Sequence, residues 1–154
     1  MSKVAVRVSQ SKANCARTLP LLFAPRVEFA QPICTATVDG KPWRYFDGRV
    51  LFLPNRPGTC AVEVRHGRPR VPVLMRTFAR IEGCRWENGA LCFRAELPPW
   101  CSQLHPQLSF TAALRGCGRT PTHASGGRIL RRDGGGATVE FRVGEVEVVF
   151  ARQP

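Results

Sequence analysis

The chain has 154 residues, of which 44% are apolar and 22% are charged, so it can bury a core, and wholesale disorder is excluded. Its formal net charge of +12 favours an anionic partner, although a basic set made almost entirely of arginine also fits a GC-rich coding sequence. The most apolar stretch, residues 18–25, is short and contains two prolines, so we expect no membrane span.

Alternation of apolar and polar residues predicts strands, because successive side chains of a strand point to opposite faces. The first such run covers residues 4–8. Next, Asp39-Gly40 and Asp47-Gly48 predict two-residue hairpins, since this pair accepts the positive φ angles of a type I′ turn. These turns place Cys34 opposite Tyr45 and build a three-stranded meander with a single apolar face. That face contains Cys34, Ala36, Val38, Trp43, Tyr45, Val50 and Phe52.

A third turn of the same kind, at residues 88–89, predicts another hairpin. Its register places Cys84 opposite Phe93 and Glu82 opposite Ala95. The aromatic and aliphatic residues then share one face, and the charged residues occupy the other. We therefore expect this hairpin to cover part of the core.

Further alternating runs follow at residues 60–65, 138–143 and 145–150, with weaker patterns at 108–114 and 128–132. The loop of three glycines after the last of these favours one more hairpin. Apolar residues hold no helical spacing over a long window. About ten short strands joined by hairpins predict an all-β protein, an antiparallel β-sandwich.

The domain organisation is predicted from length and from one break in the strand pattern. We expect a single β-sandwich domain over residues 1–154. Pro72 interrupts a strand-like run near the middle of the chain. The alternative is therefore two small β modules, residues 1–74 and 75–154.

Residues 53–64, which read Leu-Pro-Asn-Arg-Pro-Gly-Thr-Cys-Ala-Val-Glu-Val, resemble a stretch of immunoglobulin-like and fibronectin-like modules. In those modules a Gly-x-Tyr-x-Val-x-Val run enters a core strand, and the tyrosine hydroxyl caps a corner. Cys60 stands at the tyrosine position here, so that hydrogen bond is absent. The resemblance covers residues 32–96 and implies an immunoglobulin-like sandwich. Bacterial modules of this kind often sit beside glycan-processing or cell-surface domains.

The seven cysteines contain no C-x-x-C pair, which excludes the spacing of zinc ribbons and thioredoxin-like motifs. Their odd number, together with an N-terminus that lacks signal-peptide architecture, predicts reduced thiols, and the alternative is disulfides in a chain cut from a secreted protein. If Met1 is the true start, we expect a cytoplasmic protein. The hairpin register puts Cys84 and Cys92 on opposite faces and argues against a disulfide between them.

Catalytic and metal-binding groups are not clustered in the sequence. All three histidines, which we assign to loops, lack a second histidine at metal-binding spacing: His66, His105 and His123. Motifs for phosphate loops, nucleophile elbows and dinucleotide binding are missing. We therefore expect no enzymatic activity, no metal and no cofactor.

Residues 65–70 (Arg-His-Gly-Arg-Pro-Arg) look like an AT-hook, which inserts arginines into the minor groove of DNA. AT-hooks usually occur in flexible segments, whereas this one bridges two predicted strands, so the alternative is a basic hairpin or loop tip. A second basic stretch, residues 115–132, surrounds a glycine-rich loop. If both loops lie at one end of the sandwich, they form a single anion-binding rim. The candidate anion-binding residues are Arg65, His66, Arg68, Arg70, Arg128, Arg131 and Arg132.

Trp100 follows two prolines outside the predicted strands. It is a candidate aromatic contact to a sugar or base, and the alternative is that it covers the edge of the core. The sequence thus predicts a non-enzymatic binding or scaffolding module, an accessory domain or a subunit of a larger assembly, with a protein or glycan partner. The alternative is a protein that binds nucleic acid or another polyanion through the arginine-rich loops.

Overall fold

The computed structural model describes residues 1–8, 25–54, 56, 58–97 and 108–154, and this part of the chain is all-β, with fifteen strands in three sheets. The eight-stranded sheet contains, in order across it, β1 (Ser2–Val8), β7 (Gly58–His66), β3 (Ile33–Val38), β4 (Lys41–Trp43), β9 (Arg80–Glu87), β10 (Ala90–Glu96), β15 (Gly144–Arg152) and β12 (Arg119–Ser125). The four-stranded sheet contains β13 (Gly127–Asp133), β14 (Gly136–Phe141), β11 (Phe110–Arg115) and β8 (Val73–Thr77). The three-stranded sheet contains β2 (Arg26–Glu28), β6 (Val50–Phe52) and β5 (Phe46–Asp47).

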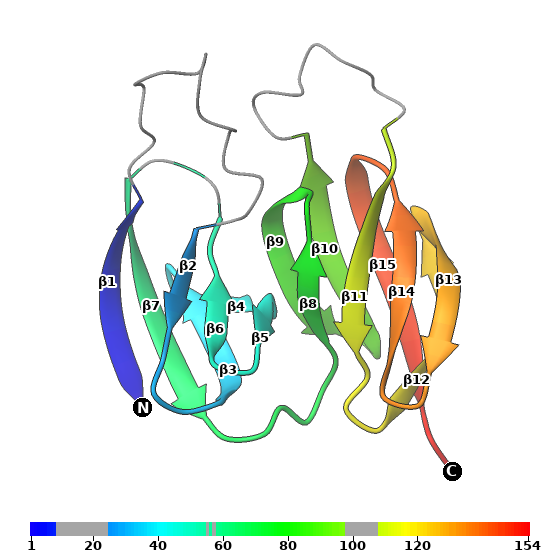
Figure 1. The fold of residues 1–154 in the computed structure, drawn as a ribbon, viewed down its shortest axis with the longest axis horizontal. Helices are drawn as coiled ribbons and strands as arrows, with labels where there is room; N and C mark the ends of the chain where they lie inside the picture. The colour runs from blue at the N-terminus through cyan, green and yellow to red at the C-terminus, as the bar shows by residue number, and fades with distance from the viewer. Residues whose placement is uncertain (9–24, 55, 57, 98–107) are drawn as a thin grey trace.

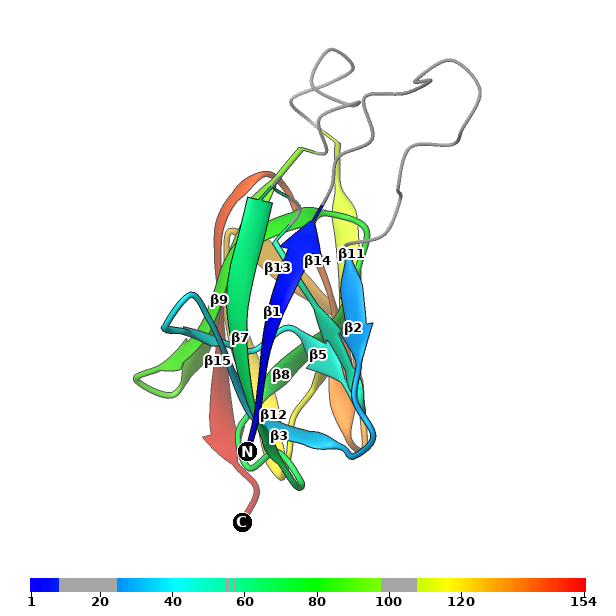
Figure 2. The same cartoon turned by 90° about the vertical axis from the view of Figure 1, so that its left-hand side faces the viewer.

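The strands form two layers (Figures 1 and 2). The eight-stranded sheet is one layer, and the other two sheets lie side by side in the second. Buried apolar residues from all three sheets form one contiguous core. Phe93 of β10 meets Phe141 of β14 edge-on across the layers, with ring centroids 5.1 Å apart. The prediction of an all-β protein is confirmed, whereas the strand order does not show an immunoglobulin-like topology.

Strands β1–β7 build one half of the molecule and β8–β15 the other (Figure 1). The halves join through the parallel pair of β4 with β9, at Trp43 and Cys84, and through a parallel bridge between Tyr45 and Leu74. Residues 67–72 connect the halves, which is where the sequence pattern breaks. Nearly all other pairs are antiparallel. The choice between one domain and two modules stays a prediction.

The hairpin around residues 88–89 is confirmed in its first part, because Cys84 lies opposite Phe93. The predicted pairing of Glu82 with Ala95 is wrong, since a β-bulge shifts the register and Ile81 takes that place. The extra residue turns Ile81 into the core, where it is 2% exposed. A bulge of this kind re-aims side chains and disrupts the ladder only locally.

The predicted three-stranded meander is wrong beyond Trp43. Ala36 lies opposite Trp43 as expected, but the chain then leaves the eight-stranded sheet, so Cys34 has no pairing with Tyr45. β5 and β6 pair instead in the three-stranded sheet. The predicted single apolar face is therefore divided between the two layers.

The turn between β5 and β6 also differs from its prediction. Phe46 lies opposite Leu51, so the connecting residues are shifted by one from Asp47-Gly48. As a result Leu51 is buried, and its neighbours Val50 and Phe52 are only partly buried. The shift by one residue exchanges the two faces of the strand, because successive side chains point to opposite faces.

Five of the seven cysteines lie in the described part of the chain, and all five are free thiols: Cys34, Cys60, Cys84, Cys92 and Cys117. The expectation of no disulfide between Cys84 and Cys92 is confirmed. The Cys60 thiol donates a weak hydrogen bond to the Val6 carbonyl, with Sγ and O 3.6 Å apart.

The loop assignment of the histidines is wrong for the two that are described. His66 is the last residue of β7, and His123 lies within β12 beside a register shift. His105 and Trp100 lie outside the described residues. Among the described residues, no helix has the length and apolar character needed to cross a membrane.

Candidate functional site

The end of the sandwich at the bottom of Figure 1, which we call the lower end, carries three connections, and the first two of them come from the two basic stretches. These are residues 67–72, 116–118 and 134–135. The two arginine-bearing loops singled out in the sequence therefore lie at the same end of the molecule. Whether the loops form one shared rim depends on where their arginine side chains lie.

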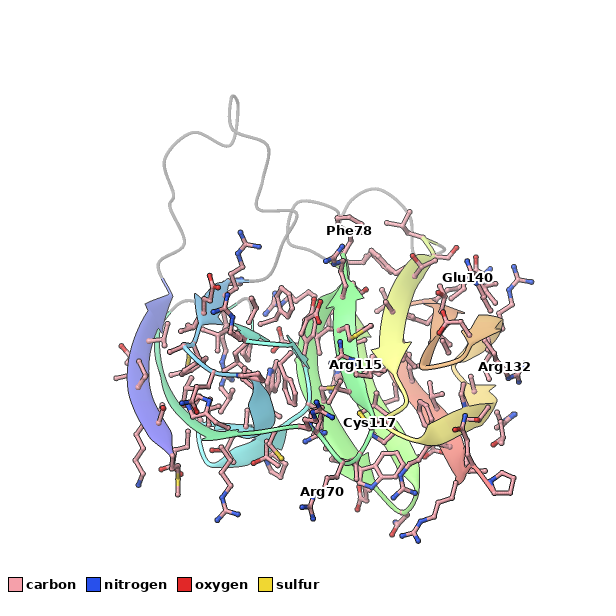
Figure 3. The ribbon with its side chains drawn as sticks, turned by 60° about the horizontal axis from the view of Figure 1, so that its bottom comes forward. Arg70, Phe78, Arg115, Cys117, Arg132 and Glu140 are labelled. Atoms are coloured by element: carbon pink, nitrogen blue, oxygen red, sulfur yellow. The ribbon has the colours of Figure 1, made fainter. Side chains whose placement is uncertain are left out.

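A cavity of about 380 Å³ opens at the lower end, where the two halves meet. Buried apolar side chains of β3, β5 and β8 form its floor: Ile33, Phe46 and Val73. Arg68 from residues 67–72 and Arg115 from β11 also line it. Figure 3 shows Arg115 and Cys117 together near the middle of this end. An apolar cavity with a few polar groups is the usual form of a ligand site.

The two arginines of the cavity are available to an anion. Arg68 is exposed and forms no ion pair with any described residue. Arg115 forms an ion pair with Asp47 at an N–O distance of 3.6 Å, and both side chains are substantially exposed. Such a pair contributes about 0–1 kcal/mol. An incoming carboxylate or phosphate can therefore displace Asp47 from Arg115 at low cost.

Arg44 explains why the chain changes sheets above this cavity. Its N–H donates to the Cys84 carbonyl of β9, and its carbonyl accepts from the N–H of Leu74 in β8, both at 2.9 Å. One residue thus bonds to a strand in each layer of the other half. This crossing ends β4 and starts β5, which places Phe46 at the floor of the cavity.

The Arg44 side chain is 5% exposed and binds only carbonyl oxygens among the described residues. Its Nη2 donates to Val71 at 2.7 Å, its Nη1 to Cys34 at 3.1 Å and its Nε to Pro72 at 3.3 Å. Burial lowers the pKa of Arg44, and nearby thiols partly offset this effect. The guanidinium holds residues 67–72 against β3, and it brings into the junction a positive charge that has no carboxylate partner in the described part of the chain.

Cys117 lines the cavity from a tight turn between β11 and β12. Its φ angle is 53°, and the Arg119 N–H closes the turn on the Gly116 carbonyl at 3.2 Å. A Cβ at Gly116 would lie 2.1 Å from the Arg119 carbonyl oxygen, so only glycine fits there. Burial raises the pKa of Cys117, while Arg44 and Arg115 lower it. The cavity therefore holds a protonated thiol in positive surroundings.

The candidate residues of the first basic stretch have different positions. Arg70 lies at the margin of the lower end, farther from Arg115 than Cys117 is (Figure 3), and Arg65 is exposed on β7. His66 forms a hydrogen bond with Ser2, with Nε2 and Oγ 2.8 Å apart, and its Nδ1 lies 3.2 Å from the Gln31 carbonyl oxygen. These contacts tie β1 to the segment before β3, so His66 has a structural role.

The candidates of the second stretch lie on β13, an edge strand of the four-stranded sheet. Arg128 forms an ion pair with Glu140 at 2.5 Å, and Arg132 donates to the Pro121 carbonyl at 2.9 Å. Arg131 is exposed. In Figure 3, Arg132 and Glu140 lie at one side of the molecule, apart from Arg115. Because β13 is at an edge of the four-stranded sheet, these arginines lie away from the cavity.

Sequence reasoning missed Arg44 and the role of Cys117. A signal for Arg44 exists in the run Trp-Arg-Tyr-Phe at residues 43–46, because an arginine between aromatic residues in a strand pattern requires buried acceptors. No local signal marks Cys117 or the meeting of Arg115 with Arg68, which depends on contacts between distant strands.

Among the described residues, no group of three or more His, Cys, Asp or Glu side chains has the arrangement of a metal site. No family model, curated protein or solved structure matches the chain. Function therefore has to be inferred from the geometry of the lower end.

Proposed function

We propose that the protein is a non-enzymatic binding module whose binding surface is the lower end, where it recognises a carboxylate-bearing group of a protein or glycan partner. The observation that carries this proposal is the convergence of Arg68 and Arg115, one from each side of the junction, on one apolar cavity. Charge-assisted hydrogen bonds from arginine suit carboxylates well.

A polyanion partner is the second candidate. It is favoured by Arg65, Arg68 and Arg70, which are exposed and form no ion pairs with described residues. A nucleic acid would bind across this surface and beyond the cavity. The two candidates differ in the number of charges that the partner engages.

The test is binding of a glutamate-rich peptide, a heparin oligosaccharide and duplex DNA over a salt series. The proposal predicts that Arg68→Gln with Arg115→Gln weakens peptide or heparin binding about 100-fold, because two charge-assisted contacts are lost. The matched control is Arg131→Gln with Arg142→Gln, which removes the same charge from two exposed arginines, one on β13 and one in the turn between β14 and β15. It should leave binding within about twofold.

A polyanion function would give a different result. DNA would then bind tightest, and log K would fall with log salt with a slope of about −0.9 for each phosphate contact. Equal losses in the lower-end variant and in its control would contradict a specific site, because binding would then follow total charge alone.

A further inference from the structure

We propose that the cavity at the lower end takes a single carboxylate that carries a short apolar body. The apolar body occupies the cavity, and the carboxylate binds Arg68 and Arg115 at its mouth. This rests on the proposed function and adds the chemistry of the ligand. The ligand is therefore an amphipathic monoanion, either a free acid or the C-terminal residue of a polypeptide.

The apolar lining of the cavity favours a ligand with an apolar body. Ile33, Phe46 and Val73 are each 1% exposed and come from three strands in both halves. Pro32 and Pro69 are more exposed and form part of the lining. An apolar group in the cavity removes its own hydrocarbon and the exposed surface of the two prolines from water, while the three floor side chains are already shielded and close the base of the cavity.

The charges around the cavity supply the preference for an anion. Arg68 has no ion pair among the described residues, and Asp47 is held only loosely by Arg115. Behind the floor, the Arg44 guanidinium carbon lies 5.1 Å from the centroid of the Phe46 ring. This third cation binds carbonyl oxygens rather than a carboxylate. In such partly buried surroundings a charge acts more strongly than it does in water.

The size and the charge balance of the site restrict the ligand. About 380 Å³ is close to the lower limit for small-molecule sites, which fits a short chain or one large side chain rather than an extended polymer. Asp47 is already paired with Arg115, and a neutral apolar molecule carries no charge with which to displace it. Such a molecule therefore gains nothing from the arginines. A small anion without an apolar body, in turn, leaves the floor unused.

The experiment compares octanoate, acetate and 1-octanol by calorimetric titration of the full chain. Each buried methylene should improve affinity about fourfold, so with roughly three to four of its six additional methylenes buried, octanoate is expected to bind about 100-fold tighter than acetate. It should bind at least about tenfold tighter than 1-octanol, which lacks the charge. Equal binding of octanoate and acetate would overturn the apolar body, and equal binding of octanoate and 1-octanol would overturn the anion.

Variants separate this proposal from the proposed function. Arg68→Gln with Arg115→Gln should weaken octanoate at least about tenfold and leave 1-octanol unchanged, while Arg131→Gln with Arg142→Gln changes neither. If the lower-end variant weakens the glutamate-rich peptide but octanoate and acetate bind alike, the proposed function stands and the ligand assignment fails. If it weakens no anion, both fail.

A peptide pair identifies the source of the ligand. A short peptide ending in leucine is compared with the same peptide amidated at its C-terminus. Tighter binding of the free acid than of octanoate identifies a polypeptide C-terminus, whereas tighter binding of octanoate identifies a free acid. Equal binding of the acid and amide peptides, together with equal binding of octanoate and 1-octanol, would contradict carboxylate recognition altogether.

Discussion

Replacement of Arg44 by alanine is expected to lower the free energy of unfolding by about 4 kcal/mol. The substitution removes three hydrogen bonds from a charged donor and leaves the carbonyls of Cys34, Val71 and Pro72 without that partner. Bonds to charged groups contribute about 1.5–3 kcal/mol each, and part of this is offset because the guanidinium no longer has to be buried. Denaturant unfolding at neutral pH measures the loss.

Two further variants make this prediction specific. Arg44→Lys keeps the charge, but one ammonium group cannot reach three separated acceptors, so an intermediate loss is expected. Arg85 is exposed and forms an ion pair with Glu87 at 2.8 Å, and Arg85→Ala should cost less than about 1 kcal/mol. An Arg44→Ala protein as stable as Arg85→Ala would show that Arg44 does not hold the junction.

Alkaline pH is expected to destabilise the protein strongly between about pH 9 and pH 12. Burial raises the pKa of the Cys84 thiol from 9 to about 12, and burial raises the pKa of Tyr45 from 10 to about 12. Both groups stay protonated in the folded state, while the unfolded chain loses these protons above its lower pKa values. The stability is therefore complete below about pH 9 and is lost as the pH rises to about 12.

The size of this effect follows from the two shifts. At about 1.4 kcal/mol for each pKa unit, Cys84 contributes about 4 kcal/mol and Tyr45 about 3 kcal/mol. The total is comparable with the whole stability of a domain of this size, so cooperative unfolding is expected before pH 12. Tyr45 is the only tyrosine in the chain, and its tyrosinate absorbance reports its titration directly.

Two variants separate the contributions of Tyr45 and Cys84 to the pH dependence of stability. Tyr45→Phe should remove the part that belongs to the hydroxyl, which accepts from the Thr77 N–H at 3.3 Å and donates to the Thr77 carbonyl at 3.1 Å. Cys84→Ala should remove the larger part and flatten the curve between about pH 9 and pH 12. Titration of Tyr45 near pH 10 in the folded protein would refute the prediction.

Local patterns in the sequence predict the hairpin turns better than they predict bulges, short strands and pairings between distant strands. The turn at residues 88–89 fixes the pairing of Cys84 with Phe93, because turn type and side-chain alternation agree there. The bulge beyond it, which places Ile81 opposite Ala95, has no sequence signal. The strand that becomes β6 is predicted from the turn before it, although with a register shifted by one residue, whereas β2 is too brief for alternation to reveal. The parallel junction of β4 and β9 depends on contacts between residues far apart in the chain.

The candidate site is predicted in part for the same reason. Arg68 stands out in the sequence because it lies in a basic loop, and the structure places it on the cavity. Arg115 reaches the same cavity from β11, which lies far from Arg68 in the sequence. No local pattern in the sequence encodes this meeting. The arginines of β13 look similar in sequence to Arg68 and Arg115, but in the structure Arg128 forms an ion pair with Glu140.

The most direct test of the account is the location of the ligand, measured by two-dimensional NMR of the isotope-labelled protein during titration with octanoate. The account predicts that the amide signals of Gly48, Gly67, Arg68 and Cys117 shift first, since these residues line the cavity. The Arg68→Gln and Arg115→Gln double variant should show much smaller shifts at equal concentrations. Shifts centred on β13, or shifts unchanged in that variant, would contradict a binding site between the two halves.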